Sequence, residues 1–226
     1  TQAGYALGIL FLLPLGDRYD RRTLILLKSI SLAVLLLTCS FTGQLHSLLI
    51  VSLLMGMAAT MAQDIVPAAA ILAPEGNQVK AVGTVMTGLL LGILLSRTVS
   101  GLVGEAFGWR EMYQLAAVSI AVITAIMWKA LPRFTVHSTL SYPSLMLSMV
   151  QLWQQYSTLR RAALAQGFLS IAFSAFWSTL AVMLSEHYHL GSAIAGAFGI
   201  AGAAGALAAP MAGHLADKVG AAKVTQ

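Results

Sequence analysis

Residues 13–22 read LPLGDRYDRR, and residues 213–223 read GHLADKVGAAK. In each stretch an aspartate, Asp17 or Asp217, is followed by a base and then by a short basic turn. The two aspartates lie 200 residues apart, and long apolar segments fill most of the chain between them. The two stretches therefore predict an internal repeat in which the same kind of polar turn separates apolar segments.

The composition predicts that most of the chain lies in lipid. Of the 226 residues, 58% are hydrophobic and 9% charged, and the mean hydropathy is +0.81. A soluble domain carries about 25% charged residues. A membrane-spanning helix needs about 20 apolar residues, and six of the apolar segments approach or exceed that length, whereas the first is short and looks like the end of a longer helix. The seven segments are 1–16, 24–42, 48–72, 81–104, 113–131, 161–184 and 192–213.

The distribution of basic residues predicts the orientation. If every segment crosses the bilayer, eleven bases fall on one side and only Arg110 falls on the other. The positive-inside rule makes the basic side cytoplasmic. The net charge of +5 is then explained by topology and anionic lipid, so it does not indicate nucleic-acid binding. The eleven are Arg18, Arg21, Arg22, Lys28, Lys80, Lys129, Arg133, Arg160, Arg161, Lys218 and Lys223.

The longest stretch without a predicted span is 132–160. It reads as a cytoplasmic linker, and within it residues 142–156 are apolar on one side. Such a pattern predicts a helix at the membrane surface. The chain is thus expected to divide into a first half at 1–131, the linker at 132–160 and the start of a second half at 161–226.

The 13–22 stretch resembles the loop between helices 2 and 3 of the major facilitator superfamily, Gly-xxx-Asp-(Arg/Lys)-x-Gly-(Arg/Lys)-(Arg/Lys). The 213–223 stretch resembles its weaker echo between helices 8 and 9. The resemblance implies an all-α membrane bundle of twelve helices, in two pseudo-symmetric halves joined by a cytoplasmic loop. Seven of the twelve, helices 2 to 8, are then present here. Leu13 and Asp20 stand where glycines are usual, which would loosen packing near Leu13 and place a side chain where a turn often needs a positive φ.

In that family the acid and bases of these loops form a charge network that latches the cytoplasmic helix ends in one of two access states. The alternative, that the bases only set topology, stays open. The residues carried over to this gating motif are Asp17, Arg18, Arg21, Arg22, Asp217 and Lys218.

A stripe of small residues runs along the segment 83–108, with a small side chain at every fourth position. Such a stripe predicts close helix packing in lipid, with ligand contact as the alternative. The spacing also resembles the helix-5 signature of the superfamily's antiporters, Gly-x8-Gly-x3-Gly-Pro-x2-Gly-Gly, with Arg97 in place of the proline. The resemblance suggests antiport. The packing residues predicted are Gly83, Gly88, Gly92, Ser96, Ser100, Gly101 and Gly104.

Arg97 and Asp64 are predicted to lie inside the membrane, where a charge costs about 2.5–3.5 kcal/mol on insertion scales. Arg97 is a candidate for binding an anionic substrate or for acting as a structural counter-ion. Asp64, beside Gln63, is a candidate proton site or a partly hydrated structural acid. Helical rise separates Arg97 and Asp64 by ~12 Å in depth, so no direct salt bridge between them is expected.

The segment 161–184 carries a polar stripe at four-residue spacing, flanked by aromatic side chains. Helix 7 of the family lines the central cavity, so the resemblance implies contact with substrate. Hydrogen bonding between helices is the alternative. The residues predicted for this role are Gln166, Ser170, Ser174 and Trp177.

The sequence thus predicts a secondary active transporter of the cell inner membrane, in which a proton gradient drives export or exchange of a small solute. Its expected partners are that solute, the coupling proton and the lipid bilayer. We expect no enzyme activity and no cofactor, and the pair His187 and His189 is a weak match to a metal site. A truncated, non-transporting remnant is the first alternative, and a seven-helix receptor or intramembrane enzyme the second.

Overall fold

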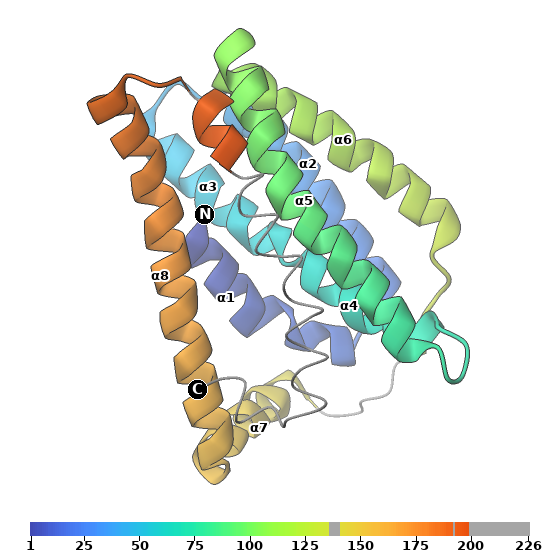
Figure 1. Cartoon of the computed structure of the whole chain (residues 1–226). Helices are drawn as coiled ribbons and strands as arrows, with labels where there is room; N and C mark the ends of the chain where they lie inside the picture. The colour runs from blue at the N-terminus through green and yellow to red at the C-terminus, as the bar shows by residue number, and fades with distance from the viewer. Residues whose placement is uncertain (136–140, 192, 199–226) are drawn as a thin grey trace.

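The computed structural model describes residues 1–135, 141–191 and 193–198, and these residues form helices joined by short turns (Figure 1). No strand occurs within those ranges. The elements are α1 (Gln2–Leu12), the 3₁₀ turn η1 (Pro14–Asp17), α2 (Arg21–Phe41), α3 (Leu45–Ala59), α4 (Met61–Leu72), α5 (Gln78–Ala106), α6 (Trp109–Ala130), α7 (Tyr142–Gln155) and α8 (Ser157–Tyr188).

Five helical stretches in the described ranges are long and apolar enough to cross a membrane: α2, α3 with α4, α5, α6 and α8. They coincide with the predicted segments 24–42, 48–72, 81–104, 113–131 and 161–184, which are confirmed as helices. Helix α8 begins at Ser157, four residues before the predicted boundary. Most of the segment 192–213, and the second loop with Asp217 and Lys218, lie outside the described residues.

Successive spanning stretches alternate in direction, as the predicted topology requires, with α3 and α4 forming one stretch. Figure 1 shows the turn after α1, the loop between α4 and α5, and α7 at the lower end of the molecule, with the loops after α2 and α5 at the upper end. Helix α2 packs against α3, α4 and α6, while α5 packs against α4 and α6. The lower end carries the basic loops, so it corresponds to the predicted cytoplasmic face.

The buried core is small and lies between α2 and its neighbours. Leu32 and Cys39 of α2 pack with Met55 and Ala58 of α3, and Tyr113 of α6 closes the cluster. Large apolar side chains elsewhere face outward; examples are Leu27 of α2, Val118 of α6 and Phe168 of α8. Extensive exposure of such side chains is costly in water, so the outer surface is suited to lipid.

Helix α1 approaches α3 closely because glycines line their contact. A Cβ at Gly4 would overlap the backbone carbonyl of Leu53, and a Cβ at Gly8 would lie 2.7 Å from Thr60 Cγ2 and 2.8 Å from the Met57 carbonyl oxygen. In lipid no hydrophobic effect drives helices together, so small residues favour association by letting the two backbones come into van der Waals contact. The close contact of α1 with α3 thus depends on Gly4 and Gly8, and not on position 13, where Leu13 replaces the usual glycine.

The predicted small-residue stripe on α5 has a different environment. A Cβ added at Gly83, Gly88, Gly92 or Gly104 would meet no heavy atom of the described chain within 4 Å. These glycines therefore contact neither α4 nor α6 closely. A packing role for the stripe stays a prediction.

The segment 142–156, predicted as a helix at the membrane surface, forms the helix α7, and its place at the membrane surface stays a prediction. Ser141 caps its first turn by accepting a hydrogen bond from the Ser144 amide, and Pro143 occupies the first turn, where the missing amide hydrogen costs nothing. The Tyr142 hydroxyl donates to the Phe11 carbonyl oxygen at 2.9 Å. Helix α7 is thereby tied to the end of α1, beside the loop that contains Asp17.

Candidate functional site

Asp20 organises the loop between α1 and α2. Its side chain caps α2 by accepting from the Arg22 amide at 3.0 Å, and the same oxygen accepts from the Phe134 amide, also at 3.0 Å. The expectation that this position needs a positive φ was wrong: Asp20 has φ −56° and ψ 116°. Aspartate is favoured here because a helix N-cap needs a side-chain acceptor with extended backbone geometry.

We expect Asp20→Ala to lower the stability of the folded protein by about 1–2 kcal/mol. Alanine removes the cap of α2 and also leaves the Phe134 amide without its acceptor. Asp20→Asn keeps a side-chain oxygen and is the matched control. Thermal unfolding in mild detergent measures both, and equal melting temperatures for the two variants would contradict this role of Asp20.

The four predicted gating residues of this loop make three separate side-chain contacts. The Arg21 guanidinium pairs with Asp17 at 2.8 Å, and the Arg22 guanidinium donates to the Trp128 carbonyl oxygen of α6 at 2.6 Å. The Asp17 side chain is 56% exposed and that of Arg21 16%. An ion pair this open to water contributes roughly 0–1 kcal/mol, so it can form and break at little cost. Arg18 lies over the Tyr19 ring, 5.7 Å from its centroid.

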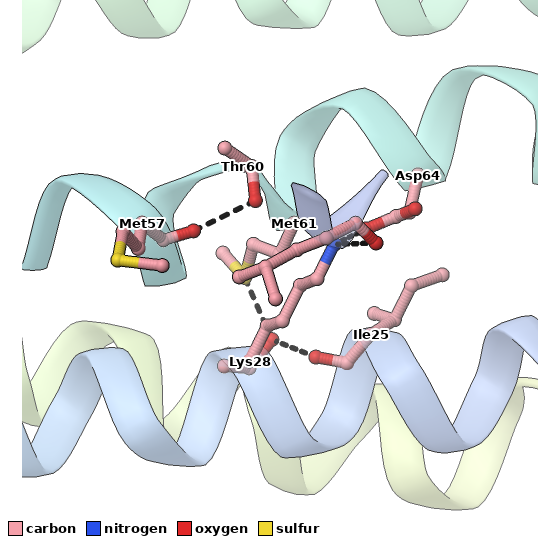
Figure 2. A network of polar contacts seen from close by, with 8 residues as sticks. Ile25, Lys28, Met57, Thr60, Met61 and Asp64 are labelled. Carbon is pink, nitrogen blue, oxygen red and sulfur yellow. Dashed lines mark hydrogen bonds and ion pairs between the residues drawn. The ribbon is translucent and has the colours of Figure 1, made fainter. Parts of the chain in front are cut away.

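A second ion pair lies deeper, between α2 and α4. Lys28 Nζ lies 2.6 Å from Asp64 Oδ2, and the two side chains are 6% and 0% exposed (Figure 2). Lys28 also donates to the Leu12 carbonyl oxygen at 3.4 Å. The grouping of Lys28 with the surface bases was therefore wrong. It lies seven residues into α2, where its long stem carries the ammonium group to the only buried acid of the described helices.

The helix that carries Asp64 is broken next to the pair. α3 ends at Ala59 and α4 begins at Met61, and the Thr60 hydroxyl donates to the Met57 carbonyl oxygen at 2.7 Å (Figure 2). Pro67 lies further along α4 and supplies no amide hydrogen to the carbonyl of Gln63. Kinks of transmembrane helices arise at such positions. The break places Asp64 in the first turn of a new helix, facing α2.

One oxygen of Asp64 remains open. Asp64 Oδ2 binds Lys28, whereas Oδ1 is buried and has no hydrogen-bond partner among the described residues. A Cβ added at Gly16 would lie 3.3 Å from Asp64 Oδ1 and 3.4 Å from Arg21 Nη1. The glycine thus lets the loop lie directly against Asp64, between the exposed ion pair and the buried one. Beside Asp64, the Gln63 amide donates to the Tyr5 hydroxyl at 2.9 Å.

Arg97 has a different partner. Its guanidinium carbon lies 4.2 Å from the centroid of the Trp177 ring, so α5 and α8 meet through a cation–π contact. The hydroxyls of Ser96 and Ser100 donate to carbonyls of their own helix, at 3.0 Å each. On α8, Ser174 is half-buried, while Gln166 and Ser170 are exposed. Substrate contact by this stripe remains a prediction.

Sequence reasoning missed two features. Lys28 is the one charged residue of the apolar run 24–42, and a lone cation in such a run signals an acid on a neighbouring helix. Gly4 and Gly8 form a Gly-xxx-Gly pair, the usual signature of close helix crossing in membranes. Both signals are present in the sequence.

The chain resembles known transporters over its length. Residues 1–225 match the family model described as Major Facilitator Superfamily. An uncharacterized transporter of Escherichia coli O157:H7, named YgaY, is 41% identical over 186 residues, which cover 82% of this chain and 47% of that protein. A probable transporter of Streptomyces coelicolor is 36% identical over 235 residues, covering 100% of this chain and 53% of the relative.

A D-xylose transporter of Levilactobacillus brevis is 33% identical over 146 residues, or 60% of this chain and 30% of that protein. The chain spans about half the length of the first two relatives. The apolar helices, the basic loop at residues 13–22 and the family match all support the same fold. The chain belongs to the Major Facilitator Superfamily, as a multi-pass membrane protein.

Proposed function

We propose that the chain is part of a secondary active transporter of the cell inner membrane, which couples proton movement to export or exchange of a small solute. The observation that carries this proposal is the buried Lys28–Asp64 pair, with one carboxylate oxygen left open. Ionisable residues within membrane helices are costly and typically mark ion pathways. The relatives in Escherichia coli and Streptomyces coelicolor, which are named as transporters, support transport as the general activity.

A change in the charge of Asp64 would break the buried ion pair. When ionised, Asp64 offsets the ammonium group of Lys28; a proton arriving at the open Oδ1 would remove that attraction. Lys28 would then be left in an apolar site without a counter-charge, which favours its movement toward water. This charge change would loosen α2 from α4 and, through the weaker contact of Lys28 with the Leu12 carbonyl oxygen, from the end of α1.

The loop between α1 and α2 lies beside a cavity that it shares with α4. This cavity of about 410 Å³ is lined by Asp17 and Arg21 on the loop and by Gln63 and Pro67 on α4. Gln63 and Pro67 flank Asp64 in the sequence of α4, so the cavity lies close to the buried pair on the predicted cytoplasmic side. We propose that Asp17, Arg18, Arg21 and Arg22 latch this end in one access state, with Asp217 and Lys218 as the counterpart in the second half.

Proton-coupled flux tests the proposal directly. The full-length protein is reconstituted in liposomes that contain the pH dye pyranine, and D-xylose, ethidium and benzoate are added as probe solutes under an imposed pH gradient. We expect at least one probe to accelerate proton movement in the wild type. Asp64→Asn, which keeps the shape but removes the charge, should reduce that coupled flux at least tenfold.

Glu75→Gln is the matched control, because Glu75 lies exposed in the loop between α4 and α5. It should leave coupled flux unchanged. Equal coupled flux in Asp64→Asn and wild type would remove Asp64 from the mechanism. Flux of a probe with no associated proton movement would overturn coupling while leaving transport in place.

The remnant alternative makes a separate prediction about the genome. A transporter requires a continuous reading frame that encodes about twelve spans, including the helices before and after this region. A stop codon or frameshift beside the region would support the remnant and would contradict the transport proposal.

A further inference from the structure

We propose that the cavity between Arg97 of α5 and Trp177 of α8 binds a small organic carboxylate. This inference rests on the proposed transport function, because it names the chemical class of the solute. The cavity has a volume of about 230 Å³, less than the roughly 300–1,000 Å³ of sites for drug-sized ligands. Its lining residues are Arg97, Ser100, Gly101, Trp177, Leu180, Ala195 and Gly196.

The guanidinium of Arg97 stacks on Trp177 and still has an N–H group without a hydrogen-bond partner among the described residues. It lies over the face of Trp177 at 4.2 Å, and its Nε is buried without a hydrogen-bond partner in the described part of the chain. Stacking occupies the face of a guanidinium and leaves the N–H groups at its edge, in the fork that matches a carboxylate. This Nε therefore marks a donor for which the described residues provide no acceptor.

No acid of the described residues pairs with Arg97. The ion pairs there are Lys28–Asp64 and Arg21–Asp17. Glu105 lies about two helical turns further along α5, and it already accepts from the Ala193 amide at 2.7 Å. A cation within a membrane helix without a counter-charge costs about 2.5–3.5 kcal/mol, and a bound anion would offset that cost.

Two further aromatic side chains of α8 contact Trp177. Phe173 and Phe176 make edge contacts with Trp177, with ring centroids 6.1 and 5.5 Å from that of the indole. These edge contacts favour one orientation of the indole, over which the guanidinium lies. One cation beside the apolar walls of Trp177, Leu180 and Ala195 matches a single negative charge on an apolar body better than a doubly charged phosphate.

The site lies where the two halves of the chain meet. Thr98 of α5 donates to the Gly196 carbonyl oxygen at 3.2 Å, and Glu105 accepts from Ala193 further along. Figure 1 shows α5 and α8 nearer to each other at the upper end of the molecule than at the lower end. A carboxylate bound by Arg97 against Trp177 would therefore contact both halves, which a rocking carrier requires of its substrate.

Equilibrium binding tests the inference. The full-length protein is purified in lipid nanodiscs, and binding of radiolabelled benzoate is measured by scintillation proximity. We expect saturable binding that unlabelled benzoate displaces and that benzamide, its neutral counterpart of similar shape, does not. Arg97→Gln should weaken binding at least tenfold, whereas Arg97→Lys, which keeps the charge but lacks the fork, should retain part of it.

Trp177→Phe provides a variant that leaves the charge in place; it should weaken binding several-fold. Size-exclusion chromatography and thermal unfolding confirm that each variant is folded. Benzoate binding to Arg97→Gln within twofold of wild type would overturn the inference, as would equal displacement by benzamide or no saturable binding to wild type.

The two proposals fail separately. Proton-coupled flux of D-xylose or ethidium without benzoate binding would sink the carboxylate site alone. Benzoate binding that depends on Arg97, without proton movement during flux, would support the site and sink only the coupling.

Discussion

Asp64→Leu is expected to destabilise the protein by about 3–5 kcal/mol, because it leaves the ammonium group of Lys28 buried without a counter-charge. Lys28 is 6% exposed and its strongest partner is Asp64; the Leu12 carbonyl, at 3.4 Å, offers only a weak second contact. Removing one partner of a buried pair costs far more than the pair contributes when intact. Thermal unfolding of the purified protein measures the loss as a lower melting temperature.

Lys28→Met should have a cost of the same size, because it leaves the Asp64 carboxylate buried with neither oxygen bound. The double variant Lys28→Met with Asp64→Leu replaces both charges by apolar groups of similar length. Such replacements are often neutral or stabilising, so we expect its stability to lie within about 1 kcal/mol of wild type. Costs that simply add in the double variant would show that the pair does not exist in the folded protein.

The double variant also separates stability from function. Its fold should be intact, whereas it has no group at this place that can bind or release a proton. We expect it to unfold like wild type and to lose proton-coupled flux. A double variant that still couples proton movement to flux would place the coupling proton elsewhere.

Much of the fold follows from the sequence, because each spanning helix makes its backbone hydrogen bonds internally and faces lipid. The segments 24–42 and 81–104, the surface helix at 142–156 and the contact of Asp17 with Arg21 depend on local patterns. Those patterns act over one or two helical turns, within reach of sequence reasoning.

The pairing of Lys28 with Asp64 depends on how α2 and α4 face one another, and no local pattern contains that information. The contact between Arg97 and Trp177 could be predicted only in part, from the depth of each residue in the membrane. Each lies about twenty residues past the start of its helix on the same side, at Gln78 and Ser157. Equal depth makes the contact possible, but the rotation of both helices decides it, and that rotation comes from packing.

Gly8→Ala is expected to destabilise the protein by about 3 kcal/mol, at the upper end of the cost of overpacking a well-packed contact. The added methyl would meet the backbone of Met57 at 2.8 and 2.9 Å, and backbone cannot rotate away as a side-chain tip can. Gly83→Ala makes the same chemical change on α5, where a Cβ would meet nothing of the described chain within 4 Å. There the higher helix propensity of alanine should raise stability by about 0.5–1 kcal/mol. Thermal unfolding of the two variants against wild type should therefore give shifts of opposite sign. A Gly8→Ala protein that melts with wild type would mean that α1 does not lie against α3 as described.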